Sequence, residues 1–200
     1  MPSETDLLND ALGQIGATRI TAIDDGSVNA NWCGVFYTPL RQALLRAHHW
    51  NFAEGRIELA QNVVKPAFEF AFAYALPADL LKIKEYNGAL LDVSAVDPLY
   101  WMHFSGYYKI EGRDLLTNDG EVKIVYVKDI TNPTLWDSLF YQAFGTHLAS
   151  KLATAIRKDH ALSESLMRQA QGILMPLAMA VDGQEGTITP YRVDELLWGR

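Results

Sequence analysis

The segment from Val28 to Phe52 constrains the fold of this chain more than any other stretch. Its apolar residues recur at steps of three and four, a spacing that places side chains on one face of an α-helix. The apolar face consists of Trp32, Val35 or Phe36, Leu40, Ala43 or Leu44, and Ala47. Arg41, Gln42 and Arg46 fall on the other face. The pattern predicts a long amphipathic helix that packs against a partner helix and ends at an aromatic cluster, residues 48–52.

Pro39 lies inside this predicted helix. A proline in a helix interior removes one backbone hydrogen bond and clashes with the preceding turn, at a cost of about 3 kcal/mol. Two structures accommodate it: a helix that kinks at Pro39, or a second helix that Thr38 caps and Pro39 begins. We expect the kinked and nearly continuous helix.

The N-terminal segment predicts a shorter helix. Ser3 precedes Asp6 by three residues, the spacing of a capping box, and acidic residues in a first turn interact favourably with the helix dipole. Gly16 is suited to the position that follows a helix. We therefore expect a helix from about Glu4 to Gly16, followed by a connector over residues 17–27.

Two further helices are predicted in the second half of the chain. Asn132 followed by Pro133 is typical of a helix start, and an apolar stripe continues from there to about Lys158. The last helix begins near Ala161. Pro176 predicts a kink or an early end in that helix.

Between these helices the hydrophobic period changes from that of a helix to that of a strand. Residues 67–76, AFEFAFAYAL, alternate large and small side chains, which predicts a strand with one aromatic face. Asn87-Gly88 is the strongest hairpin signal in the chain. Further strands are predicted at residues 80–86, 107–110 and 122–127. Together they indicate a small antiparallel sheet or sandwich inserted between helices.

The predicted fold class is therefore α+β. A bundle of about four helices comprises residues 1–53 and 131–182, and an antiparallel β lobe, residues 54–130, is inserted into it. Residues 183–200 form an extended C-terminal arm with too little apolar content to fold alone. We expect the arm to dock on another surface, because tryptophan is an efficient interface anchor. The predicted interface residues are Tyr191, Leu196, Leu197 and Trp198.

Composition limits the class of protein. The chain has 200 residues, of which 49% are hydrophobic and 20% charged, as is typical of a globular protein. No apolar run approaches the roughly 20 residues of a membrane-spanning helix, and the polar, acidic start does not resemble a signal peptide. Cys33, the one cysteine, cannot form an internal disulfide, which suits assembly in a reducing cytoplasm. We expect it to be packed rather than reactive.

The net charge of −7 argues against a protein that grips nucleic acid, because phosphate neutralisation needs clustered basic residues. The basic residues of the predicted helices are scattered among acids, as on a solvated helix face. They are Arg41, Arg46, Arg157, Lys158 and Arg168.

The sequence predicts no metal, cofactor or catalytic residue. His48 and His49 are adjacent, so in a helix their rings diverge by about 100° and cannot share a metal without other ligands. His103, His147 and His160 do not have the spacing of a metal motif. One of the two adjacent histidines is expected to hold the end of the long helix.

Paired carboxylates leave one enzymatic alternative open, a hydrolase of cell-wall or capsule polysaccharide. Solvated carboxylates in turns and strands are the interpretation we favour. The candidates are Asp24, Asp25, Glu54, Glu58, Asp114 and Asp119.

Four segments, taken in order, resemble one protein family. They are LLNDALGQIGATRITAIDD near the start, RAHHWNFA, YALPADLLKI, and AMAVDGQEGT with a tryptophan close to the C-terminus. In this order they resemble the head-to-tail adaptor of short-tailed phages, also called tail tubular protein A, over most of the chain.

The resemblance implies a structural virion protein without catalysis or cofactor. It implies a dodecameric ring in the neck of the virion, between the portal and the tail nozzle, assembled in the host cytoplasm without a membrane. DNA would pass through the ring without specific binding. An acidic lining would keep the duplex from adhering.

Overall fold

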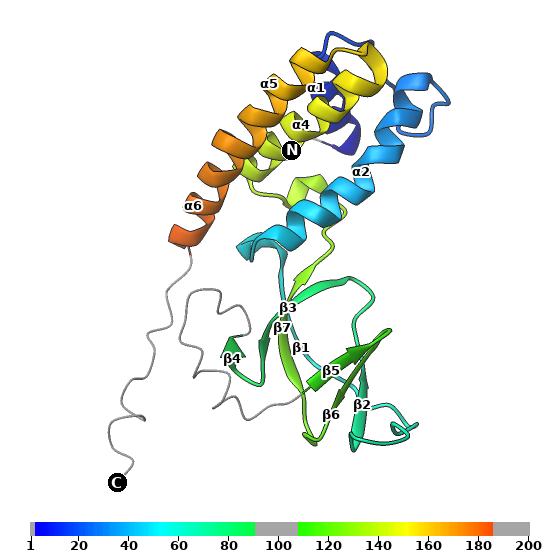
Figure 1. Ribbon diagram of the computed structural model, residues 1–200, viewed down its shortest axis with the longest axis vertical. Helices are drawn as coiled ribbons and strands as arrows, with labels where there is room; N and C mark the ends of the chain where they lie inside the picture. The colour runs from blue at the N-terminus through cyan, green and yellow to red at the C-terminus, as the bar shows by residue number, and fades with distance from the viewer. Residues whose placement is uncertain (1–2, 91–107, 186–200) are drawn as a thin grey trace.

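The computed structural model describes residues 3–90 and 108–185, which form a helical bundle and a β lobe (Figure 1). The helices are α1 (Glu4–Gln14), α2 (Val28–Ala47), α4 (Ser138–Leu152), α5 (His160–Gln169) and α6 (Met175–Glu185). A π-helical turn, η3 (Ala153–Arg157), extends α4, and a second, η4 (Ala170–Leu174), joins α5 to α6. The bundle thus has four helical segments, and the α+β fold class is confirmed. In the described ranges, no helix has the length and apolar character needed to span a membrane.

Helix α4 lies at the centre of the bundle and contacts α1, α2, α5 and α6. Its side chains Phe140 and Phe144 are completely buried. The Trp50 ring packs edge-on against Phe140 at a centroid distance of 4.8 Å, and Trp136 contacts Phe144 at 5.0 Å. The aromatic cluster predicted after the long helix is therefore part of the bundle core.

The prediction for the first helix is confirmed. The Asp6 N–H donates to Ser3 Oγ (3.2 Å), and the Ser3 N–H donates to the Asp6 carboxylate (2.8 Å), which completes the capping box. Helix α1 ends at Gln14, and Gly16 adopts a φ of +65°, a conformation that glycine takes without strain.

Helix α2 continues through Pro39 without interruption, so the continuity of the long helix is confirmed, whereas the kink stays a prediction. The helix reaches the aromatic cluster of residues 48–52, as predicted, but includes none of it. The helix stops at Ala47, because His48 has extended backbone angles, and Trp50 Nε1 donates to the carbonyl of Leu44 (3.0 Å). His48 and His49 therefore do not lie in the helix.

The predicted apolar face of α2 is partly wrong. Trp32 and Val35 are exposed. The buried face is displaced around the helix and consists of Ala30, Cys33, Tyr37, Leu40, Arg41 and Leu45. Its displacement follows from α4, against which this side of α2 packs.

Arg41 was expected in solvent but is only 6% exposed. Its Nε donates to Asp129 Oδ1 (2.7 Å) and its Nη2 to Oδ2 (3.0 Å), and Gln42 donates to the same carboxylate (2.8 Å). A paired guanidinium with an apolar stem is compatible with this burial. Because Asp129 follows the last strand, the ion pair fastens α2 to the exit of the β lobe.

The β lobe consists of two antiparallel sheets, as expected for an inserted sheet or sandwich. One has the order β1-β7-β3-β4 and the other β2-β6-β5. The strands are β1 (Glu54–Glu58), β2 (Phe72–Ala75), β3 (Leu80–Tyr86), β4 (Ala89–Leu90), β5 (Tyr108–Glu111), β6 (Asp114–Thr117) and β7 (Lys123–Lys128). Gln61, just after β1, forms a bridge to Tyr74 in β2 and so links the two sheets. Asn87 and Gly88 both have positive φ, which confirms the two-residue hairpin between β3 and β4.

Several element bounds differ from the prediction. The strand expected over residues 67–76 is limited to β2, because Glu69 takes a φ of +71° and breaks the extended backbone. Asn132 caps only a short 3-10 turn, η2 (Pro133–Leu135), whereas Asp137 caps α4. Helix α6 continues to Glu185, three residues into the range assigned to the C-terminal arm.

Candidate interaction surfaces

The candidate catalytic carboxylates are distributed over the molecule and hold local structure. Asp25 accepts hydrogen bonds from the N–H groups of Ser27 and Thr21 (each 2.9 Å) in the turn before α2. Hydrogen bonding by the Ser27 hydroxyl, followed by the N–H groups of Ser27 and Thr21, lowers the pKa of Asp25 to about 2. Asp24 is exposed in the same turn.

The other four carboxylates lie in the β lobe. Glu54 pairs with Lys84 (2.6 Å) and Arg56 (2.7 Å), and Glu58 is exposed. Burial raises the pKa of Glu54, but hydrogen bonds from Lys84 and Arg56 outweigh it, so the net shift is downward.

Asp114 is the first residue of β6, and Asp119 lies two residues after the end of this strand. Asp114 accepts from Asn62 Nδ2 (2.9 Å), and Asp119 accepts from the Tyr86 hydroxyl (2.6 Å). Burial, followed by the hydrogen bond to Asp119, raises the pKa of Tyr86. Structural partners thus account for both carboxylates.

The histidines, like the carboxylates, lie at separate places in the structure. His48 Nε2 lies 3.1 Å from the buried carboxylate of Asp182 and links the end of α2 to α6, as expected of a histidine that holds the helix end. His147 is buried in α4, and burial, followed by the charge of Lys151, lowers its pKa to about 4. Within residues 3–90 and 108–185, no group of His, Cys, Asp and Glu is arranged to hold a metal ion. His103 lies outside the described residues.

Cys33 is buried against the core, as predicted. Burial, and secondarily the charge of Asp25, raises the pKa of its thiol to about 11. A thiol with so high a pKa is almost entirely protonated near neutral pH and therefore weakly nucleophilic.

The predicted interface residues of the arm, Tyr191, Leu196, Leu197 and Trp198, lie outside the described residues. The described part of the chain nevertheless exposes apolar side chains at other places. Three groups of them have the character of interaction surfaces.

The first two groups lie on the helical bundle. Val28, Trp32 and Val35 occupy one side of α2, and we call them the α2 surface; Val28 is 69% exposed. Ile173 and Leu177, one helical turn apart, form the α6 surface, and Ile173 is 63% exposed. Both α2 and the α5–α6 segment pack on α4, and Figure 1 shows them on different sides of it. The two surfaces are therefore separate.

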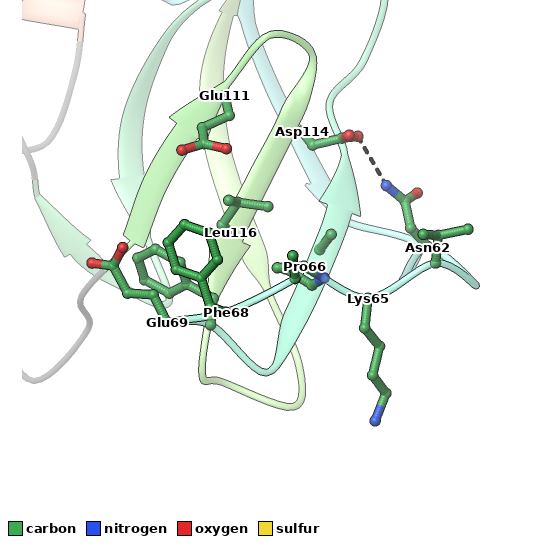
Figure 2. A pocket seen from close by; sticks show the side chains of 12 residues that line it. Asn62, Lys65, Pro66, Phe68, Glu69, Glu111, Asp114 and Leu116 are labelled. Carbon is green, nitrogen blue, oxygen red and sulfur yellow. Dashed lines mark hydrogen bonds between the residues drawn. The ribbon is translucent and has the colours of Figure 1, made fainter.

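The third group lies on the loop that precedes β2, and we call this loop, residues 62–70, the lobe tip. Val63 is 99% exposed, Phe68 is 81% exposed, and Val64 is also exposed. Beside them is a hollow of about 370 Å³, which Figure 2 shows from close by. Buried Phe70 and Leu116 belong to the small apolar cluster beneath it.

Carboxylates predominate around this hollow. Glu69, Glu111 and Asp114 line it, and Lys65 is the one basic residue among the described residues of the lining. In Figure 2 the Lys65 side chain extends away from the acidic groups. Its Nζ lies 5.8 Å from the centre of the Phe72 ring.

The hydrophobic periodicity of the sequence did not predict these surfaces. The alternation over residues 67–76 placed Phe68 on the buried face of a predicted strand. The helical periodicity likewise placed Trp32 and Val35 on the buried face of the long helix. One signal was present at the lobe tip: Val63 and Val64 are followed directly by a charge and a proline, a poor context for a buried strand. No profile of a known protein family and no curated protein sequence matches this chain.

Proposed function

We propose that this chain is a structural virion protein, a head-to-tail adaptor whose copies form a ring between the portal and the tail nozzle. The ordered sequence resemblance supports this proposal. The structural observation that carries it is the pair of separate apolar surfaces on the bundle, the α2 surface and the α6 surface.

A closed ring needs two different surfaces on each subunit, because each copy presents one patch to the copy before it and another to the copy after it. The α2 and α6 surfaces lie on different helices that both pack on α4. In the proposed ring, the α2 surface of one copy contacts the α6 surface of the next. Trp32, which stacks on Phe36 at 5.8 Å, is the aromatic anchor of this contact.

The ring stoichiometry and the two binding partners, the portal and the nozzle, are proposed from the sequence resemblance. The ring is dodecameric, binds the portal on one side and the nozzle on the other, and lies in the neck of the virion. The residues Tyr191 to Trp198 contact a neighbouring subunit or the portal. The net charge of −7 is compatible with a ring through which DNA passes without binding.

The proposal is tested by native mass spectrometry of the chain, alone and mixed with its cognate portal protein. The wild-type chain is expected to form a ring-sized complex in at least one of these samples. A chain that remains monomeric in both would contradict the proposal.

Two variants test which surfaces meet. Val35→Glu disables the α2 surface and Ile173→Glu the α6 surface, so neither variant alone is expected to form rings. Each retains the surface that the other has lost, and an equimolar mixture is therefore expected to give a heterodimer that grows no further. Val63→Glu, on the lobe tip, is the control and should assemble as the wild type does. Normal rings from either bundle variant would exclude that surface from the contact.

We also propose that the protein acts by assembly and not by catalysis. The partners of Asp25, Glu54, Asp114 and Asp119 support this view. Purified protein is expected to release no sugar from peptidoglycan or capsule polysaccharide. Release that is lost in an Asp114→Asn or Asp119→Asn variant with an unchanged melting temperature would favour the hydrolase alternative.

A further inference from the structure

We propose that the lobe tip is a docking site for a segment of a partner protein that presents an arginine or lysine beside a large apolar side chain. Val63, Val64 and Phe68 project into solvent within six residues of chain. A cluster of this kind on the surface of a globular protein marks an interaction site more often than chance exposure. The inference does not depend on ring assembly, because the lobe tip is distinct from the two bundle surfaces.

The loop is held in a defined conformation although its apolar side chains are exposed. The Phe70 N–H donates to the carbonyl of Phe68 (2.8 Å) across Glu69, which forms a γ-turn, and the Ala71 N–H donates to Asn118 Oδ1 (2.8 Å). Phe70 is buried under the turn. Because the loop is already ordered, binding would cost little additional conformational entropy.

The charges around the hollow select a cationic partner. Asp114 is hydrogen-bonded to Asn62, and Glu111 pairs with Lys109 (2.8 Å). Glu69, in contrast, has no ion pair with any residue in the described ranges. Lys109 offsets the charge of Glu111, and Lys65 extends away from the acidic groups, so the carboxylates of Glu69 and Asp114 give the hollow a negative balance.

The exposed ring of Phe68 adds a second determinant. Figure 2 shows Phe68 beside Leu116 and between Glu69 and Glu111. A guanidinium can stack on an aromatic face and donate to a carboxylate at the same time, and so arginine is the favoured cation. The valines next to it would contact the neighbouring apolar side chain. An anionic lipid surface fits less well, because the same carboxylates repel it.

The test is nuclear magnetic resonance titration of the full-length, isotope-labelled chain with two capped tripeptides, leucyl-arginyl-leucine and leucyl-glutamyl-leucine. The arginine peptide is expected to shift the amide signals of residues 62–70 and 111–116 in a saturable manner. The glutamate peptide should bind at least about fivefold more weakly, the effect of an exposed ion pair replaced by repulsion. Equal binding of the two peptides, shifts confined to other regions, or no shift with either peptide would overturn the proposal.

Variants then assign the contacts. Phe68→Ser and Glu69→Gln should each weaken the binding of the arginine peptide severalfold, whereas Leu135→Ser and Asp24→Asn, at exposed positions outside the β lobe, should leave it unchanged. Sedimentation with vesicles of phosphatidylcholine and phosphatidylglycerol tests whether the lobe tip binds an anionic membrane instead of a protein segment. Binding to these vesicles that Phe68→Ser abolishes would overturn the proposal in favour of a membrane contact.

Discussion

Asp182 accepts a 2.9 Å hydrogen bond from the backbone N–H of Asn51, 131 residues earlier in the chain. Asn51 Nδ2 donates in return to the carbonyl of Asp182 (2.6 Å), and His48 Nε2 lies 3.1 Å from the second carboxylate oxygen. Asp182 itself is buried. These contacts fasten the last helix to the segment that leaves α2.

Replacement of Asp182 by alanine should therefore destabilise the fold. The substitution leaves the Asn51 N–H and the His48 ring without their carboxylate partner in a partly buried site, and the expected loss in the free energy of unfolding is about 2 kcal/mol. Urea unfolding followed by tryptophan fluorescence measures it. Glu185→Ala, at an exposed position of the same helix, is the control and should change stability by no more than about 0.5 kcal/mol. Equal effects of the two substitutions would show that the Asp182 contacts contribute little.

Arg41→Met should also destabilise the protein, by about 3 kcal/mol, because it leaves Asp129 without its bidentate partner in a mostly buried site. The double variant with Asp129→Asn should lose less than the sum of the two single changes, since it removes both charges. Arg56→Met is the control: its ion pair with Glu54 is solvent-exposed on the arginine side and should be worth less than about 1 kcal/mol. If the double variant lost as much stability as the two single variants together, Arg41 and Asp129 would not be energetically coupled.

Gly55→Ala should weaken the β1–β7 pairing. Gly55 lies opposite Tyr126, and a Cβ at this position would come within 2.9 Å of the tyrosine ring. Because Tyr126 is buried, the clash is expected to cost about 2 kcal/mol, measurable by chemical unfolding. Gly34→Ala, on the exposed side of α2 with nothing near its Cβ, should instead stabilise the helix by up to about 1 kcal/mol.

Asp25 predicts a specific dependence of stability on pH. Hydrogen bonds lower its folded-state pKa from 3.8 to about 2, so its contribution is fully present above pH 4 and is lost as the pH falls toward 2. Asp25→Ala should therefore unfold at a lower temperature than the wild type at pH 6, and the difference should shrink as the pH falls from 4 to 2. Melting curves across this range measure it. A difference that stays constant down to pH 2 would show that the carboxylate charge plays no part.

Local sequence signals predicted those elements in which one chemical feature decides the structure. The capping box of Ser3 and Asp6 sets the start of α1, and Asn87-Gly88 sets the β3–β4 hairpin, because each depends on residues that are neighbours in the chain. The order of elements, helices on either side of an antiparallel lobe, followed from the change of hydrophobic period. The strands β1 and β6 were missed, because their sequences, EGRIE and DLLT, do not alternate apolar and polar residues.

The remaining differences come from contacts between distant parts of the chain. Arg41 has the sequence context of a surface residue, and only the position of Asp129, 88 residues later, allows it to be buried. The aromatic residues at 68 and 70 alternate as in a strand, but the turn at Glu69 places one of them in solvent and the other in the interior. Which side of α2 is buried depends on where α4 packs.

The pairing of Glu54 with Val127 has a consequence for how this protein can change over evolutionary time. The first and last strands of the lobe are neighbours, so the chain departs from the bundle and returns to it at nearly the same point. Insertions or deletions between β1 and β7 would leave the spacing of those two points unchanged. The helical part can therefore be retained by selection while the residues between β1 and β7 diversify.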